Sequence, residues 1–306
     1  MKLPTIPFVI ILDIDSTIVG DVAYVMEESS LHEMLRQKCA MDDTVQCSRL
    51  KGNFVEAFEG GLLRPYVKEF LMAMQSAYSP LEIFVFSSGS DHWVPIIVSE
   101  IEKYCGIHVH RPLFSRGDTV LGADQLGAYS FTKSINLVSV RIINALKDRY
   151  KALNTEENCK HMIASRLLML DDRSDVIIDQ ASRHIKVPAY NYSYAYDITC
   201  GLPKSLRESP LVAQYMKAMT KGSSVSYPFI DLSSSSPSSN DNHEARMRYH
   251  LEMASLMERM LQSNASYTSD TVFKKLLKML VKKEKAVYKD WPDKVVRSIN
   301  KRLDTK

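Results

Sequence analysis

The sequence lacks the features that mark secreted, membrane-spanning and P-loop proteins. No run approaches the roughly 18 consecutive apolar residues that a membrane-spanning helix needs. The short apolar stretch near the N-terminus breaks at Asp13 without a small-residue cleavage site, so it does not indicate a secretion signal. No glycine-rich loop ending in GK[ST] occurs, which argues against a fused kinase. We also find no internal repeat, and we expect no membrane partner.

Cysteine is scarce and scattered. The five cysteines lie far apart: Cys39, Cys47, Cys105, Cys159 and Cys200. They form no CxxC pair and their number is odd, so neither a disulfide framework nor a redox motif is indicated. This usage favours a reduced intracellular setting, cytoplasmic or nuclear, over secretion.

The small net charge hides a strong asymmetry. Residues 271–306 contain 12 Lys and Arg against 4 Asp and Glu, a net charge of +8. The total is +3, which leaves −5 for the rest of the chain. A basic C-terminal region on a mildly acidic body is compatible with an acidic or nucleic-acid partner for residues 271–306, although a solvated lysine-rich face is the favoured interpretation.

Strand-like and helix-like patterns alternate over residues 1–215. Three short apolar runs are separated by helical stretches: Phe8–Leu12, Leu81–Phe86 and Leu167–Leu170. This alternation predicts an α/β domain with a Rossmann-like parallel sheet and flanking helices. In such sheets the active crevice lies outside the carboxyl ends of the strands, where each run is followed by polar residues.

Three further segments complete the predicted organisation. Residues 18–62 form an insertion that is either a lid or small cap over the crevice or an extra packing helix. Residues 216–242 contain a serine-rich stretch and predict a flexible linker. Residues 243–306 predict a small, basic, all-α segment, in which one helix runs from Thr271 to about Asp290 and ends at Trp291-Pro292.

Two aspartates follow the first apolar run in "PFVIILDIDSTIVG". Residues i and i+2 on a strand or its extension point the same way, so Asp13 and Asp15 can address one spot. An ionised carboxylate is a nucleophile without a helper base, and aspartyl-phosphate is an established intermediate. A divalent cation must screen the repulsion between carboxylate and phosphate, and Mg²⁺ suits an all-oxygen site. We predict Asp13 as nucleophile, Asp15 as acid/base, and Thr17 as a brace for Asp15 or the loop.

The other strand ends supply the remaining groups. Asp171 and Asp172 would complete the metal site, while Ser87 offers a hydroxyl and Lys133 a positive charge to a phosphate. Each of these residues by itself is better explained as a turn, a helix cap or a surface lysine. Their occurrence in this order, after apolar runs, makes an accidental pattern improbable.

The ordered set resembles the haloacid dehalogenase-like superfamily of phosphotransferases. "RPYVKEFLMAMQSAYSPLEIFVFSSGSDHW", from Arg64 on, is similar to the RNA polymerase II C-terminal-domain phosphatases, also called NLI-interacting-factor-like phosphatases. "LFSRGD", "YSFTKSINLV" and "RLLMLDDRSDVI" stand where that family keeps its phosphate lysine and terminal acid pair. The resemblance covers about Pro7 to Tyr196.

The resemblance implies a Mg²⁺-dependent phosphatase of phosphoserine and phosphothreonine in proteins, for instance in a Ser/Pro-rich tail such as the RNA polymerase II C-terminal domain. It implies Asp13 as the phosphorylated nucleophile and Asp15 as the acid/base. Implied ligands of Mg²⁺ are Asp13, the backbone carbonyl of Asp15, and Asp172, with Asp171 beside them. Implied phosphate-binding residues are Thr17, Ser87, Lys133 and, by a looser alignment, Arg116.

The chain departs from the family in two places. The usual first motif, DLDETL, reads DIDSTI here, which keeps both acids and the threonine. Residues 18–62 are longer and more helical than the family's open entrance, and a lid there would disfavour a bulky phosphoprotein. A phosphatase of nucleic-acid ends or small phosphate esters therefore remains an alternative. So does a binding protein that has lost turnover and works through its basic helices.

Two other motifs invite a functional reading. "CGIHVH", Cys105–His110, has a spacing that could bind zinc, but no partner pair is evident, so ordinary histidines on a strand are favoured. "AYNYSYAYD", Ala189–Asp197, could form an aromatic wall for a proline-rich peptide or for bases. A strand that packs its aromatic side chains is the favoured interpretation.

Overall fold

The structure is a computed structural model. It describes residues 5–20, 54–123, 129–173, 179–192 and 267–304, and seven residues between Leu251 and Ala265. The linker predicted at 216–242 lies outside these ranges, as do residues 21–53 of the predicted insertion. The chain forms two compact units, and the first comprises Met1–Gly20, Phe54–Tyr190 and Thr268–Lys306. The elements described below belong to this first unit, unless stated otherwise.

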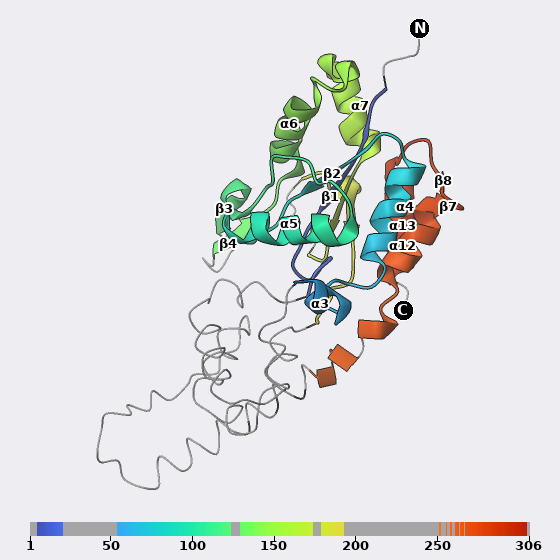
Figure 1. Cartoon of the computed structure of the whole chain (residues 1–306). Coiled ribbons are helices and arrows are strands. Elements are labelled where there is room, and N and C mark those ends of the chain that lie inside the picture. Colours follow the sequence, from blue (N-terminus) through green and yellow to red (C-terminus); the bar gives the residue numbers. More distant parts are fainter. Residues whose placement is uncertain are drawn as a thin grey trace. The chain divides into compact units, whose positions relative to one another are not determined.

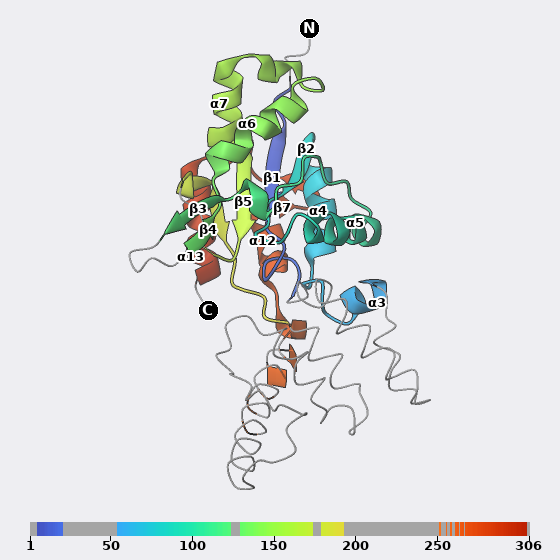
Figure 2. The same ribbon diagram turned by 90° about the vertical axis from the view of Figure 1, so that its left-hand side faces the viewer.

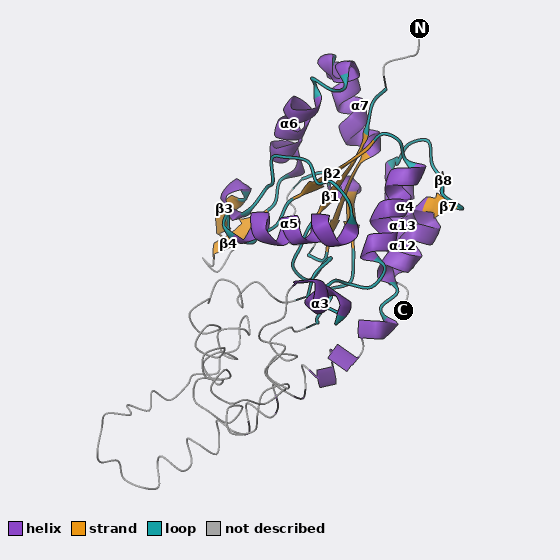
Figure 3. Cartoon of the chain, viewed as in Figure 1, coloured by secondary structure: helices purple, strands orange, loops and turns teal. Residues whose placement is uncertain are grey.

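A four-stranded parallel sheet forms the centre of this unit (Figures 1 and 3). The order of its strands is β2-β1-β5-β6. Its strands are β1 Phe8–Leu12, β2 Leu81–Val85, β5 Leu167–Asp171 and β6 His184–Lys186. All three strand pairs are parallel, so each connection has to cross over the sheet. The predicted Rossmann-like α/β fold is confirmed, and all three predicted strands are present.

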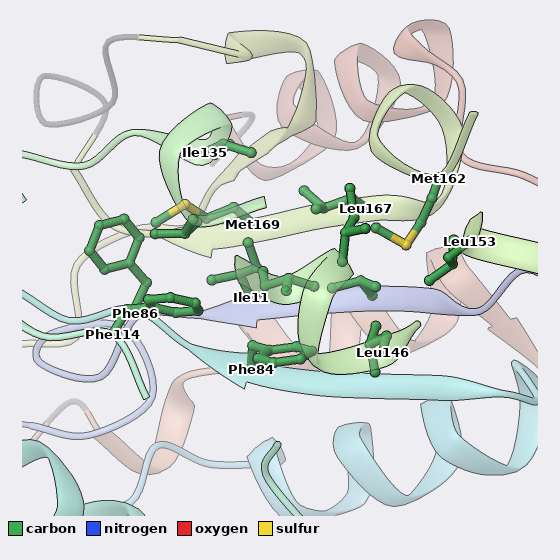
Figure 4. Packing of buried hydrophobic residues seen from close by; sticks show 14 of the residues in the cluster. Ile11, Phe84, Phe86, Phe114, Ile135, Leu146, Leu153, Met162, Leu167 and Met169 are labelled. Carbon is green, nitrogen blue, oxygen red and sulfur yellow. The ribbon is translucent and has the colours of Figure 1, made fainter. Parts of the chain in front are cut away.

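The sheet is covered on both faces. Every residue of β1, β2 and β5 is buried, as expected for a parallel sheet between two helical layers. On one face, Val9 and Ile11 of β1 pack in a core cluster with residues of α6 (Ile135–Leu146) and α7 (Glu156–Arg166). Figure 4 shows this cluster beneath the helices.

The C-terminal segment, which runs from Asp270 onward, covers the other face of the sheet. There α4 (Val67–Ala77) packs against α12 (Val272–Leu280), and α13 (Asp293–Asp304) packs against β6 (Figure 2). The rings of Phe8, Tyr78 and Trp291 meet at centroid distances of 4.7–4.9 Å. Residues almost 300 positions apart in sequence thus share one core.

Two buried arginines and one half-buried arginine attach this segment to the sheet and its helices. Three pairs join an arginine of the sheet and its helices to an aspartate of the segment: Arg64 with Asp270, Arg166 with Asp290, and Arg183 with Asp293. Every Lys and Arg between residues 272 and 304 is exposed. The segment therefore turns three acidic side chains toward arginines of the fold and its basic side chains toward solvent.

The predicted helix from Thr271 to about Asp290 is wrong in its length. Helix α12 ends at Leu280, and a short antiparallel hairpin follows, with β7 Val281–Lys282 and β8 Lys285–Ala286. The two residues of its turn, Lys283 and Glu284, have positive φ angles, as a tight hairpin turn requires. Val281 is still buried, but the polar residues 282–285 are exposed and cannot continue the buried face of the helix.

The remaining elements border the sheet. They are α3 Phe54–Glu59, α5 Trp93–Cys105 and an antiparallel hairpin of β3 Val120–Ala123 with β4 Tyr129–Thr132. Short 3₁₀ turns lie at Arg116–Asp118, Lys151–Asn154, Ala181–Arg183 and, in the C-terminal part, Tyr267–Ser269. Among the described helices, none has the length and apolarity that crossing a membrane would demand.

Candidate active site

Polar residues gather at the carboxyl edge of the sheet, as the sequence predicts. Asp13 follows β1, Ser87 follows β2, and Asp171 is the last residue of β5. The ammonium group of Lys133 lies 2.6 Å from Asp13 Oδ1 and 2.7 Å from Asp171 Oδ2. Both contacts are buried ion pairs, so distant parts of the chain meet at one point.

The loop after β1 explains how the two aspartates are placed. Asp13 continues the extended chain, since its amide donates to Leu170 O at 2.9 Å. The chain then turns, and Ile14 O accepts hydrogen bonds from the amides of both Ile18 and Val19 at 3.0 Å. Asp15 is therefore oriented by a tight turn. The sequence-based expectation that strand alternation orients it is wrong.

Ser16 is the strained residue of this turn. Its φ angle of 60° is in the left-handed region, which is uncommon for a residue other than glycine. The backbone carbonyl of Ser16 accepts a hydrogen bond from Tyr190 N at 2.6 Å, and its amide donates to Val19 O at 2.8 Å. These contacts hold a conformation that the isolated chain would disfavour.

Thr17 joins two of the carboxylates. Its hydroxyl lies 3.0 Å from Asp13 Oδ2 and 3.3 Å from Asp172 Oδ1, and it accepts a hydrogen bond from Asp172 N at 3.0 Å. The side chain is fully buried. Thr17 therefore connects the ends of β1 and β5, where the sequence pointed to a brace for Asp15 or for the loop.

Lys133 is fixed by the helix that follows it. Ser134 caps α6, and its hydroxyl accepts from Leu137 N at 3.1 Å. The carboxylate of Asp179 accepts from the amides of Ile135 and Asn136 at 2.7 and 3.2 Å. Asp179 was missed in the sequence, because nothing local in "RSDVIID" indicates a contact with a helix end more than 40 residues away.

Burial has the largest effect on the pKa values of the clustered carboxylates. Burial raises the pKa of Asp13 to about 6, with a further rise from Asp171, while Lys133 acts in the opposite direction. Burial also raises the pKa values of Asp171 and Asp172. Burial opposes the charge of Lys133, but the neighbouring Asp13 and Asp171 outweigh it and raise the pKa of the lysine.

The charge and the donor atoms fit a divalent cation. Asp13, Asp171 and Asp172 each offer an oxygen within 4.8 Å of the others, and no other group of metal-ligating side chains this close occurs in the described part of the chain. One ammonium against three carboxylates leaves two negative charges without compensation when all are ionised. An all-oxygen set of this charge suits Mg²⁺.

The end of β2 contributes the remaining predicted residues. The hydroxyl of Ser87 is fully buried, 3.3 Å from Asp15 Oδ2, and it accepts a hydrogen bond from Gly89 N at 2.9 Å. Arg116 is exposed, and its Nε donates to Ser88 O at 3.0 Å. The structure thus places Arg116 beside the Ser87 turn and outside the cluster around Lys133.

The histidine motif forms neither the favoured strand nor a zinc site within the described residues. Cys105 ends α5, where burial raises the pKa of its thiol to about 11, and residues 107–110 are irregular. His108 lies 3.4 Å from Glu102, and His110 contacts Glu82. The histidines therefore have separate acidic partners.

The tyrosine motif is described only in part. Residues 189–192 form no strand, which corrects the favoured interpretation for that stretch, and 193–197 lie outside the described residues. Tyr190 and Tyr192 are buried. The backbone amide of Tyr190 donates to Ser16 O in the loop after β1.

The sequence model of the family described as NLI interacting factor-like phosphatase matches residues 8–200. Among solved structures, a variant of the fission yeast RNA polymerase II CTD phosphatase Fcp1, bound to beryllium fluoride, is similar at 16% identity with a TM-score of 0.34. The match covers 69% of this chain and 50% of that chain, so it spans half the length of Fcp1. No curated protein matches the sequence.

Proposed function

Because the chain belongs to the family of NLI interacting factor-like phosphatases, we propose that it hydrolyses phosphoserine and phosphothreonine esters of proteins through an aspartyl-phosphate. The observation that carries the proposal is the cluster of the buried Asp13, Lys133 and Asp171 with the half-buried Asp172 at the carboxyl edge of the sheet. A nucleophile, a fixed positive charge and a set of metal-ligating oxygens are the groups that phosphoryl transfer to a carboxylate needs.

Asp13 and Asp172 are the proposed side-chain ligands of Mg²⁺, with the backbone carbonyl of Asp15. Asp171 has a different part, because its Oδ2 contacts Lys133 and its Oδ1 accepts a hydrogen bond from Arg173 N at 2.8 Å. We therefore assign Asp171 to holding Lys133, in place of the metal role expected from the sequence. When bound, Mg²⁺ would offset the negative charge of the carboxylates and polarise the phosphoryl oxygens.

In the first step, a carboxylate oxygen of Asp13 attacks phosphorus and the ester P–O bond breaks. Asp15 gives its proton to the leaving serine or threonine oxygen, so the alcohol departs neutral. The phosphoryl group stays on Asp13. Lys133 and the hydroxyl of Ser87 are the donors proposed to face its oxygens, and Thr17 keeps the attacking carboxylate in orientation.

In the second step, Asp15 removes a proton from water as the water oxygen attacks phosphorus. The bond between phosphorus and the Asp13 oxygen breaks, and inorganic phosphate leaves. Asp13 is again a carboxylate and Asp15 again carries a proton. The cycle needs no other reactant, and each residue returns to its starting state.

The experiment compares phosphoserine and phosphothreonine peptides, 3′-phosphorylated DNA and an aryl phosphate, with Mg²⁺ and with EDTA. We expect Mg²⁺-dependent hydrolysis that is fastest on the peptides and absent in Asp13→Asn. Asp148→Asn makes the same chemical change at a fully exposed side chain and serves as the matched control. If no ester is hydrolysed and Asp13→Asn changes nothing, the chain is a binding protein that has kept the fold.

A second candidate substrate is a phosphorylated nucleic-acid end. The observation in its favour is the exposure of all Lys and Arg side chains between residues 272 and 304, because a phosphate backbone would be attracted to such a surface. Faster hydrolysis of the 3′-phosphorylated DNA than of the peptides would select it. The matched family supports a phosphatase, and we propose a protein substrate, in particular a tail such as the RNA polymerase II C-terminal domain, in an intracellular setting, nuclear or cytoplasmic.

A further inference from the structure

Arg64 connects the candidate active site to the C-terminal segment. Its side chain is 0% exposed, and its Nη1 donates to the backbone carbonyl of Thr17 at 3.0 Å. Thr17 is the residue whose hydroxyl joins Asp13 and Asp172. One guanidinium therefore fixes the backbone of the residue that orders two of the three carboxylates.

The other side of the same guanidinium is held by the C-terminal segment. Nε and Nη2 of Arg64 donate to Asp270 Oδ2 at 3.1 and 2.9 Å, across 206 positions of sequence. The second oxygen of Asp270 accepts from Val272 N at 3.0 Å, which ties the carboxylate to the start of α12. The orientation of the Asp270 carboxylate is thus fixed, and the carboxylate in turn fixes the orientation of the Arg64 guanidinium.

Aromatic rings enclose this contact. The guanidinium carbon of Arg64 lies 5.3 Å from the ring centre of Tyr190 and 5.7 Å from that of Phe273. Tyr190 N in turn donates to Ser16 O in the loop after β1. A fully buried cation between rings is strongly destabilised when its carboxylate is removed, so the position of Arg64 depends on Asp270.

We propose that Arg64 and Asp270 are positioning residues of the candidate active site. Asp270 holds Arg64, Arg64 holds the backbone of Thr17, and Thr17 holds the carboxylates of Asp13 and Asp172. The segment from Asp270 onward is then part of the machinery that shapes the loop at 13–19. The effect on turnover rests on the proposed function, whereas the effect on the loop does not.

The test compares Asp270→Asn with Asp290→Asn. Asp290 also pairs with an arginine, since Arg166 Nε lies 2.7 Å from it, but that arginine donates to Ile6 O at the opposite edge of the sheet. Hydrogen exchange is followed in peptides that cover residues 13–20. We expect exchange about tenfold faster or more in Asp270→Asn and unchanged in Asp290→Asn. Equal exchange in the two variants, whether raised or not, overturns the proposal.

Further variants keep the test decisive. Arg64→Lys retains the charge without the two-sided fork and should behave as Asp270→Asn does, whereas Asp270→Glu should restore part of the protection. If Asp270→Asn fails to fold, the double variant Arg64→Met/Asp270→Leu removes the buried charges and still lacks the bond to Thr17. In it, too, faster exchange at 13–20 is expected, and wild-type exchange there overturns the proposal.

Turnover supplies the second readout. In Asp270→Asn we expect kcat to fall about 10- to 100-fold with a smaller change in KM, because the loop orders the reacting groups more than it binds substrate. Asp290→Asn should keep the wild-type kcat, and a matching fall in both variants would overturn the proposal. If the wild type hydrolyses none of the esters, the proposed function fails, and hydrogen exchange still decides whether Asp270 holds the loop.

Discussion

At the residue scale, the hydroxyl of Thr17 is the smallest group on which the arrangement depends. Thr17→Val keeps the shape but removes the contacts to both carboxylates and the acceptor for Asp172 N. We expect kcat to fall about 10- to 100-fold and a higher Mg²⁺ requirement, with about 1–3 kcal/mol less stability. Steady-state kinetics over a Mg²⁺ titration measure kcat and the Mg²⁺ requirement, and urea unfolding measures the stability. Thr17→Ser keeps the hydroxyl and should recover most of the rate; a fully active Thr17→Val would show that the hydroxyl is dispensable.

Also at the residue scale, Glu82 links stability to pH. Burial opposes its charge, but hydrogen bonds from His110 and Tyr150 and the charges of His110 and Arg149 outweigh it, so its pKa is lowered. A lowered pKa means that the stabilisation is present above the pKa of the unfolded chain, about 4.3, and is lost as pH falls through the folded value. The difference in unfolding free energy between wild type and Glu82→Gln should therefore be largest near neutrality.

The measurement is urea unfolding of both proteins from about pH 7 down to about pH 3.5, across the reference pKa of glutamate. Glu157→Gln, at an exposed position of α7, is the matched control and should stay within about 0.5 kcal/mol of the wild type at every pH. If the difference in unfolding free energy between wild type and Glu82→Gln is constant over this pH range, the charge of the Glu82 carboxylate is not what stabilises its contacts.

At the scale of elements, the N-terminus of α6 controls where Lys133 lies. Asp179→Ala removes the acceptor for the amides of Ile135 and Asn136, which should cost about 0.5–2 kcal/mol. Because Lys133 stands just before this helix end, KM for a phosphate ester should rise as well. Thr155→Ala removes the cap of α7, away from the cluster, and is expected to lower stability without changing KM. If Asp179→Ala and Thr155→Ala have equal effects on KM, Asp179 does not control the position of Lys133.

The sequence predicts those elements whose signal is local. The three strands are found because their apolar runs are buried on both faces, and the proximity of Asp13, Ser87 and Asp171 is expected because each stands at or just after the end of a run. The turn that orients Asp15 is not found, since a left-handed Ser16 carries no sequence mark. The partners Arg64 and Asp270 are not found either, because only tertiary packing selects one buried carboxylate for one buried arginine across 206 positions.

At the scale of the whole molecule, the C-terminal segment looks like a separate basic module in sequence, but most of its apolar side chains are buried, and Asp270, Asp290 and Asp293 pair with arginines of the fold. Trp291 is fully buried against Phe8 and Tyr78, and the backbone of Leu280 accepts from Tyr78 Oη at 2.7 Å. The exposed lysines contribute charge without packing. Removing one large ring should therefore matter far more to folding than removing several lysines.

This difference gives the last prediction. Trp291→Ala should lower the unfolding free energy by about 3–5 kcal/mol, because it opens a cavity between the sheet and its second helical layer. The triple variant Lys275→Ala/Lys278→Ala/Lys282→Ala removes three exposed charges and should change stability by less than about 0.5 kcal/mol per site. Urea unfolding followed by circular dichroism compares them. If Trp291→Ala unfolds at the wild-type midpoint, the segment is an appendage, and the coupling from Asp270 to the loop at 13–19 loses its structural basis.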